Sequence, residues 1–229
     1  MAIYAIGDLH LSVAAKKPMD IFSGWDNHAE KLIENWRRKI RDEDTVVLAG
    51  DTSWGMDLAQ AAADFRLIHK LPGQKILLKG NHDYWWDSLA KMNGTLAKHE
   101  LHSLRFLHNN SYFVQGMHIC GSRGWLFESG EAHDEKIIRR EAIRIEASLK
   151  SRSGQPGETV LFLHYPPIFG SQTQEAFIAL MQQYGVKKCC YGHIHSSGHK
   201  YAVQGNCRGI EMKMISSDYL AFDPLLIKA

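Results

Sequence analysis

The sequence predicts a mixed α/β domain in which two sheets pack face to face and helices cover their outer sides. Short apolar runs with the length of buried strands recur along the chain, and each stops at a polar residue of a kind that binds metals. Amphipathic helical patterns separate the early runs, which indicates parallel βαβ units. Two later segments carry hairpin signals and indicate antiparallel strands.

Five apolar runs are expected to be buried strands. In chain order they are "AIYAI", "TVVLA", "KILLK", "TVLFL" and "KCCY". The polar residues that follow these runs are Asp8, His10, Asp51, Asn81, His82, Asp83, His164, His193 and His195. In open α/β sheets ligands bind at the carboxyl ends of the strands, so we expect these side chains to gather at one site.

Four segments show the apolar i, i+3, i+4, i+7 spacing that is typical of amphipathic helices. They cover residues 29–40, 58–65, 138–149 and 176–184. The hairpin signals lie at Asn109-Asn110 and at Gly205-Asn206. No repeat, low-complexity tract or Pro/Gly-rich linker divides the chain, so residues 1–229 are expected to form one domain.

The composition narrows the class of protein. The 27 basic and 25 acidic residues leave a formal net charge of +2 without a long like-charged block. The charge pattern therefore does not predict a nucleic-acid-binding surface. No stretch approaches the roughly 18 apolar residues of a membrane span, and no signal peptide is visible, so we expect a cytoplasmic protein. The four cysteines form no CxxC pair and are expected to be reduced thiols packed in strands.

Seven of the polar residues offer two carboxylates, one amide and four imidazoles as metal ligands: Asp8, His10, Asp51, Asn81, His164, His193 and His195. Each residue alone could have a structural role instead of binding metal. Asp8 or Asp51 could form an Asx turn, and His164 could simply end a strand. Without thiolate the set suits Mn, Fe, Zn, Ni or Co. Seven ligands are too many for one ion that must also bind substrate, so two metals that share a carboxylate fit better, as in phosphoryl transfer.

The motifs "GDLH", "GDTS", "GNHD", "LFLHYPP" and "GHIH", in this order, resemble the signature of the calcineurin-like metallophosphoesterase family. The resemblance spans residues 7–195. It implies a four-layer α/β/β/α sandwich of two mixed sheets with a dinuclear metal site at the carboxyl ends of the strands. It also implies a metal-dependent phosphoric ester hydrolase, in which a metal-bridging hydroxide attacks a phosphodiester or phosphomonoester of a small molecule or nucleotide.

The same resemblance implies roles for individual residues. One metal would be held by Asp8, His10, Asp51 and His195, and the other by Asp51, Asn81, His164 and His193, with Asp51 as the bridge. His82 would contact the substrate phosphate and assist the leaving oxygen, and Asp83 would orient its ring.

The segment "GDTSWG" departs from the serine/threonine protein phosphatases, whose second aspartate is followed by a stretch ending in Asp-Arg-Gly. Protein phosphatase activity is therefore not expected, and the resemblance is closer to predicted bacterial and archaeal phosphohydrolases. Arg123 is a candidate for the missing cation, and Trp54 and Tyr84 are candidate substrate contacts. The following pair, Trp85-Trp86, either walls the pocket or packs in the core.

Two other functions remain open at this point. One is a metal-dependent nuclease, which the absence of a basic patch disfavours. The other is a non-catalytic scaffold on the same fold, which has no need of His82 or of a full ligand set. The expected partner is a small-molecule phosphate ester, with no membrane and with nucleic acid not favoured.

Overall fold

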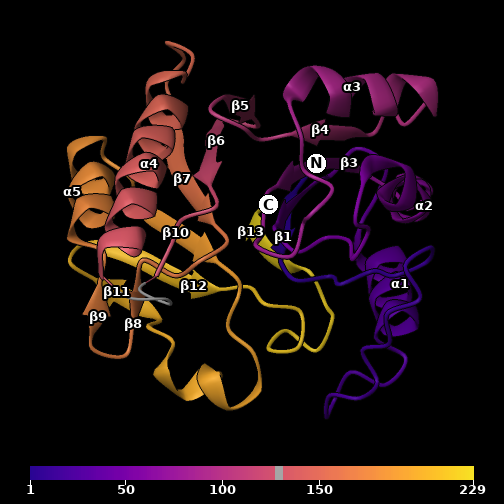
Figure 1. The fold of residues 1–229 in the computed structure, drawn as a ribbon. Coiled ribbons are helices and arrows are strands. Elements are labelled where there is room, and N and C mark those ends of the chain that lie inside the picture. The colour runs from indigo at the N-terminus through magenta and orange to yellow at the C-terminus, as the bar shows by residue number, and fades with distance from the viewer. Residues whose placement is uncertain (127–130) are drawn as a thin grey trace.

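The computed structural model describes residues 1–126 and 131–229 and places most of its strands in two sheets (Figure 1). The first sheet has the order β13-β1-β2-β3-β4 and consists of β13 (Leu225–Lys228), β1 (Ile3–Ile6), β2 (Thr45–Ala49), β3 (Gln74–Leu78) and β4 (Leu104–Phe106). The second has the order β11-β12-β10-β7-β6-β5 and consists of β11 (Gly205–Cys207), β12 (Ile210–Met214), β10 (Lys188–Tyr191), β7 (Glu158–Leu163), β6 (Met117–Ser122) and β5 (Ser111–Val114).

Both sheets are mixed, and each has a parallel centre. Strands β1 to β4 run parallel, and β13 joins β1 in the antiparallel sense. In the second sheet β6, β7, β10 and β12 run parallel, and β5 and β11 are antiparallel edges. Parallel strands end on the same side of their sheet, so the loops that follow them share one edge.

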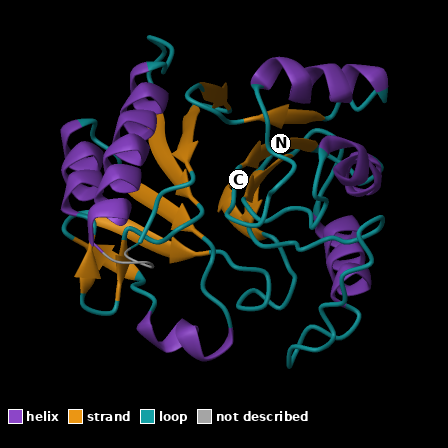
Figure 2. Cartoon of the chain, viewed as in Figure 1, coloured by secondary structure: helices purple, strands orange, loops and turns teal. Residues whose placement is uncertain are grey.

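Helices cover the outer side of each sheet (Figures 1 and 2). The helices over the first sheet are α1 (His28–Lys39), α2 (Leu58–His69) and α3 (Leu89–Lys98), and those over the second are α4 (Glu131–Lys150) and α5 (Glu175–Gln183). The remaining elements are the small hairpin of β8 (Ile168–Phe169) and β9 (Gln172–Thr173) and the 3₁₀ helix η1 (Ser196–Tyr201). The helix–sheet–sheet–helix order confirms the expected four-layer sandwich.

Three apolar clusters join the four layers. Successive side chains of a strand point to opposite faces, so a central strand can contribute to two clusters. In β2, Val46 and Leu48 pack beneath the helices of the first sheet, whereas Val47 and Ala49 pack between the two sheets. The third cluster lies between the second sheet and α4 and α5. A strand with both faces buried has no polar alternation, which is why the strand runs in the sequence are continuously apolar.

The hairpin between β5 and β6 turns at a different place from the one expected. Its turn is Gln115-Gly116, and both residues have positive φ, at 51° and 71°. Asn109 and Asn110 instead lie between β4 and β5, where the chain passes from the first sheet to the second. The expected hairpin there is therefore wrong.

The second hairpin is also shifted along the chain. Gly205 and Asn206 lie inside β11, and the turn to β12 is Arg208-Gly209, with φ of 53° and 81°. A two-residue hairpin turn with positive φ at both positions matches the right-handed twist of the strands. The strand register, rather than the nearest Gly-Asn pair, decides where the chain turns.

Helix α3 has no counterpart among the expected helices. Its apolar stripe is short, with Met92 and Leu96 buried, and Gly94 interrupts it. Glycine disfavours a helix interior by about 1 kcal/mol, so the local signal is weak and packing on the first sheet decides. The expectation for the cysteines is confirmed, because all four are free thiols on strands β6, β10 and β11.

Candidate metal centre and active site

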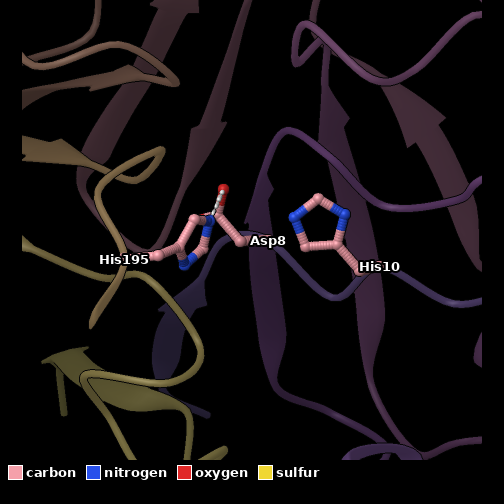
Figure 3. Close-up of side chains that lie close together, drawn as sticks. All are labelled: Asp8, His10 and His195. Carbon is pink, nitrogen blue, oxygen red and sulfur yellow. Dashed lines mark ion pairs between the residues drawn. The ribbon is translucent and has the colours of Figure 1, made fainter. Parts of the chain in front are cut away.

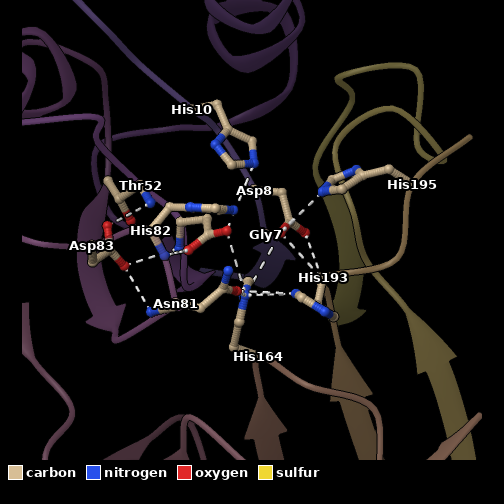
Figure 4. A network of polar contacts seen from close by, with 12 residues as sticks. Gly7, Asp8, His10, Thr52, Asn81, His82, Asp83, His164, His193 and His195 are labelled. Atoms are coloured by element: carbon tan, nitrogen blue, oxygen red, sulfur yellow. Dashed lines mark hydrogen bonds and ion pairs between the residues drawn. The ribbon is translucent and has the colours of Figure 1, made fainter. Parts of the chain in front are cut away.

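The seven candidate metal ligands lie on the loops after β1, β2, β3, β7 and β10, where the carboxyl edges of the two sheets meet, and Figure 4 labels all of them except Asp51. Backbone hydrogen bonds tie these loops together. The N–H of Asp8 donates to Gly50 at 2.9 Å, the N–H of His10 donates to Asp51 at 2.9 Å, and the N–H of Gly192 donates to His164 at 3.0 Å. The side chains are therefore held on a preformed backbone frame.

Four of the seven candidate ligands have a left-handed backbone. The φ angles are 59° at Asp8, 47° at His10, 50° at Asp51 and 70° at His193. Non-glycine residues adopt this region at a cost, and they persist in it where the surroundings enforce it, often at functional sites. The conformation turns these side chains back toward the edge of the sheets.

The glycines of the "GN" and "GH" motifs make room for carboxylates. A Cβ on Gly80 would lie 2.1 Å from Asp51 Oδ1, and a Cβ on Gly192 would lie 2.5 Å from Asp8 Oδ2. No side chain fits at either distance. The glycine before Asn81 and the one before His193 are therefore required for the loops to approach each other closely.

The first group of ligand atoms consists of Asp8, His10 and His195 (Figure 3), whose ligand atoms all lie within 4.8 Å of one another. His195 Nε2 lies 3.5 Å from Asp8 Oδ1. All three side chains reach the same space from two loops, one after β1 and one after β10.

The second group consists of Asp8, Asp51 and His164, whose ligand atoms also lie within 4.8 Å of one another, and Asn81 and His193 lie next to His164. His164 Nδ1 lies 3.0 Å from the carbonyl oxygen of Ala49, to which it donates, so Nε2 is left as a lone pair. Asn81 Oδ1 lies 2.6 Å from Nε2, and His193 Nδ1 lies 3.3 Å from it. A carbonyl oxygen and an imidazole lone pair repel each other unless a cation lies between them, so this arrangement fits a metal ion.

One oxygen of Asp51 faces both groups. Its Oδ2 lies 3.8 Å from His10 Nε2 and 3.5 Å from His164 Nε2. Its Oδ1 accepts a hydrogen bond of 2.7 Å from the backbone N–H of His82, which fixes the carboxylate. Ligand atoms on one tetrahedral ion at about 2.1 Å lie about 3.4 Å apart. The spacing around Asp51 Oδ2 therefore fits a carboxylate shared by two ions.

The charges in the centre fit cations as well. Burial raises the pKa of the Asp51 carboxyl well above its ordinary value, and the charges of Asp83 and Asp8 raise it further. Burial lowers the pKa of His10 to about 3 and lowers that of His164 well below its ordinary value. Neutral imidazoles present lone pairs to metals, and nearby cations keep clustered carboxylates ionised.

The carboxylate of Asp83 has a different role from the expected one. Its buried carboxylate accepts hydrogen bonds of 2.7 to 3.3 Å from the backbone N–H groups of Asp51, Thr52, Ser53 and Gly80 and from the indole of Trp85. Burial raises the pKa of Asp83 to about 6, against the lowering effect of the backbone donors. Both oxygens are used to hold the loop after β2, so the expectation that Asp83 orients the ring of His82 is wrong. Asp83 positions Asp51 instead.

The ring of His82 lies beside the ligand cluster without belonging to either group (Figure 4). The hydroxyl of half-exposed Tyr84 lies 3.2 Å from His82 Nδ1 and takes the place expected for Asp83. Burial lowers the pKa of His82, and the charges of His193 and Lys17 lower it further. When Tyr84 donates to Nδ1, the proton of the neutral ring is at Nε2.

Asp218 belongs to the site although no sequence motif surrounds it. Its Oδ1 accepts a hydrogen bond of 2.9 Å from His195 Nδ1, and its Oδ2 accepts one of 2.9 Å from the backbone N–H of Ser196. Burial lowers the pKa of His195, but the charges and hydrogen bonds of Asp8 and Asp218 raise it to about 10. A proton or a metal ion between Nε2 and Asp8 satisfies both groups. Carboxylates behind ligating histidines commonly orient them in this way.

Replacing Asp218 by Asn is expected to lower the affinity for one metal ion by about 10- to 100-fold. The affinity for the other ion should stay unchanged, because only the first group contains His195. Competition with a chelator measures both affinities. The matched control is Asp223→Asn, which removes a surface partner of Lys39 at 2.7 Å on the same C-terminal segment. Equal affinities in the Asp218 variant and the control would remove Asp218 from the site.

An apolar pocket with a volume of about 280 Å³ adjoins the centre. It is lined by His10, Met19, Phe22, Trp25, Trp54, His82, His195 and Ser196. The ring of Trp54 stacks on His10 with 4.9 Å between centroids, and Lys17 Nζ lies 3.7 Å from the centroid of Trp54. No motif points to Met19, Phe22 or Trp25, and the one signal in the sequence is the apolar content of the segment before α1.

Arg123 is not brought to this pocket. Its guanidinium lies 3.6 Å from the buried carboxylate of Glu141 on α4 and 4.7 Å from the ring centroid of Trp125. The buried carboxylate needs a cationic partner, which explains the direction of the side chain. Among the described residues that line the pocket there is no arginine.

The pair Trp85-Trp86 belongs to the core rather than to the pocket. Trp85 is buried with its ring centroid 4.8 Å from that of Phe65, and Trp86 packs 5.6 Å from Phe106. Of the two alternatives for these residues, packing beneath α2 and α3 is confirmed.

The family comparison agrees with this site. The model of the calcineurin-like phosphoesterase family matches residues 1–197. The protein belongs to this family, whose members are metal-dependent hydrolases of phosphate esters. No curated protein matches the chain significantly.

Solved structures show the same fold at low identity. A protein of unknown function from Aquifex aeolicus, AQ665, is 18% identical, with a TM-score of 0.51 over 98% of this chain and 95% of that one. The protein TT1561 of Thermus thermophilus is 13% identical, with a TM-score of 0.57 over 99% and 97%. GAP50 of Plasmodium, described as an anchor in the inner membrane complex, is 10% identical, with a TM-score of 0.54 over 95% and 72%.

The helices of the described residues are too short or too polar to cross a membrane. In residues 1–126 and 131–229, none of them combines the length and the apolar content that a crossing requires.

Proposed function

We propose that the protein is a dinuclear metal-dependent phosphoesterase that acts on a small-molecule phosphodiester. The observation that supports this most is the position of Asp51 Oδ2, within 3.8 Å of His10 Nε2 and within 3.5 Å of His164 Nε2. One carboxylate oxygen that faces two ligand groups is the arrangement two neighbouring ions need. The ions would be held by Asp8, His10, Asp51 and His195 and by Asp51, Asn81, His164 and His193.

The side chains divide the work of hydrolysis among them. A pair of bound ions would supply positive charge for the phosphoryl oxygens and would lower the pKa of bound water toward neutrality. The neutral ring of His82 would donate a hydrogen bond from Nε2 to the leaving oxygen and so stabilise the negative charge that develops there. Tyr84 holds the other ring nitrogen, and Asp83 holds the loop that carries Asp51. Met19, Trp25 and Trp54 keep one side of the centre apolar and exclude water from it.

The lining of the pocket favours a diester over a monoester. A monoester carries a dianionic terminal phosphoryl group, which is served best by cations beyond the metals. Among the described lining residues none is lysine or arginine, and Lys17 stands over Trp54 at the side. A diester has a single negative charge and a second organic arm, which an apolar wall can accommodate.

With Mn²⁺, the protein is expected to hydrolyse bis-p-nitrophenyl phosphate with a higher kcat/KM than p-nitrophenyl phosphate. Steady-state rates on metal-stripped and reloaded protein measure both values. Because Arg123 pairs with Glu141, Arg123→Ala is expected to leave the ratio of the two unchanged, whereas Lys17→Ala should lower the monoester rate more. A clear monoester preference in the unmodified protein contradicts the proposal.

A scaffold without chemistry is the alternative from another class. Such a protein needs neither a shared carboxylate nor His82, and both are present. Hydrolysis of either ester by the reloaded protein, with none by the Asp51→Ala variant, excludes the scaffold. A nuclease is distinguished by offering single-stranded DNA as the substrate in the same assay, because only a nuclease would cleave it.

A further inference from the structure

We infer that the apolar pocket binds the aromatic arm of the ester, so that the substrate is an aryl-type phosphate ester rather than a sugar phosphate or a nucleotide. This rests on the proposed function. The aromatic pocket is the cavity lined by His10, Met19, Phe22, Trp25, Trp54, His82, His195 and Ser196.

The aromatic pocket and the metal centre share two side chains, and the pocket also contains His82. His10 and His195 belong to the first ligand group, and His82 is the proposed hydrogen-bond donor to the leaving oxygen. The ring centroid of Trp25 lies 5.6 Å from that of His10 and 5.5 Å from that of His195. The centroid of Trp54 lies 4.6 Å from that of His82. A group in the pocket is therefore close enough to be bonded to a phosphate at the centre.

The walls favour a flat, weakly polar group. Trp25 and Trp54 are buried indoles, and Met19 fills the space beside them. The indole N–H of Trp54 already donates to Met19 Sδ at 3.3 Å, and His195 Nδ1 already donates to Asp218. Of the described lining residues only Ser196 adds an aliphatic hydroxyl.

Those walls disfavour a nucleobase or a sugar. Either group carries several hydrogen-bonding atoms, and each such atom buried without a partner costs binding free energy. A phenyl or naphthyl ring has no such atoms and gains from contact with indole faces. A cavity of about 280 Å³ holds one such ring system and little more.

Phe22 provides exposed apolar surface that a ligand in the aromatic pocket would bury. Its side chain is 49% exposed, although it lies next to buried apolar residues. Its neighbour Ile21 is 73% exposed and does not line the aromatic pocket. Burying an apolar surface is favourable in proportion to its area, so an arm packed on Phe22 gains affinity while Ile21 contributes none. The two residues form a matched pair for mutagenesis.

The test is the binding of phenylphosphonate and methylphosphonate, which cannot be hydrolysed as esters, to Mn²⁺-loaded protein by isothermal titration calorimetry. We expect phenylphosphonate to bind about 10-fold more tightly, as the burial of one ring predicts. Phe22→Ala should reduce this preference to about 3-fold or less, and Ile21→Ala should leave it unchanged. Octylphosphonate serves as the apolar ligand without a ring and is expected to bind less tightly than phenylphosphonate.

Each outcome decides the inference. A phenyl preference that falls in Phe22→Ala and persists in Ile21→Ala supports the aromatic pocket, even if no ester is hydrolysed and the proposed function fails. Equal binding of the phenyl and methyl compounds, or a preference that Phe22→Ala does not alter, overturns the aromatic pocket while hydrolysis of simple esters still supports the proposed function. If octylphosphonate binds more tightly than phenylphosphonate, the pocket prefers an alkyl chain to an aryl ring, and the assignment is overturned as well.

Discussion

Replacing Asp51 by Ala is expected to remove both metal ions from the protein and to abolish phosphoesterase activity. The Oδ2 atom of Asp51 is the one that faces His10 in the first group and His164 in the second. Its loss removes negative charge from both ions at once, and it also frees the backbone N–H of His82. Metal analysis after dialysis measures the effect. We expect two ions per chain in the unmodified protein and close to none in the variant.

A second substitution shows whether the loss is specific to the shared position. His10→Ala removes a ligand from the first group alone, so it should mainly lower the affinity for one metal ion. Far-UV circular dichroism of both variants establishes that the sandwich is intact. Two ions per chain in the Asp51 variant would mean that the assignment of a shared carboxylate is wrong.

Replacing His82 by Ala is expected to leave both ions in place and to slow hydrolysis by about 100-fold or more, the size of effect that a positioned hydrogen-bond donor to a developing charge supplies. The ring of His82 lines the aromatic pocket and lies 5.8 Å from the ring of His10, but it belongs to neither ligand group. Metal content and kcat are measured on the same preparation. The substitution removes a ring without disturbing the hydrogen bond of its backbone N–H to Asp51.

The control for His82 is Tyr84→Phe, which keeps the ring of residue 84 and removes the hydroxyl 3.2 Å from His82 Nδ1. Its effect on kcat should be smaller than that of His82→Ala, because the imidazole remains. A drop in metal content in the His82 variant would place His82 among the ligands and contradict the proposed role.

Much of the site could be read from the sequence, because it is built at the ends of strands. Asp8, Asp51, Asn81 and His193 each follow a glycine at the end of an apolar run, and His164 follows such a run directly. Strands that run parallel end at one edge of their sheet, so a local pattern repeated along the chain becomes a cluster in space. The five buried strands and four of the five α-helices were predictable for a similar reason, since their apolar spacing is set by the period of each element.

The two hairpin turns and helix α3 were less predictable because their local signals are weak. Asn109 and Asn110 have the composition of a turn, but the chain uses them to pass between sheets. Gln115 and Arg208 adopt positive φ because the strand register requires it there. Pairing along a whole strand outweighs the preference of one or two turn residues.

The sequence by itself determined the four layers, the ligand types and the order in which they occur, because these depend on periodicity and on which residues end each strand. Only the tertiary structure decided which groups those ligands meet. Asp218 reaches His195 from a loop with no motif, Asp83 holds the backbone around Asp51, and Arg123 turns to Glu141. These contacts join segments far apart in the chain, so they depend on packing and on the pairing of buried charges, which leave no regular spacing in the sequence.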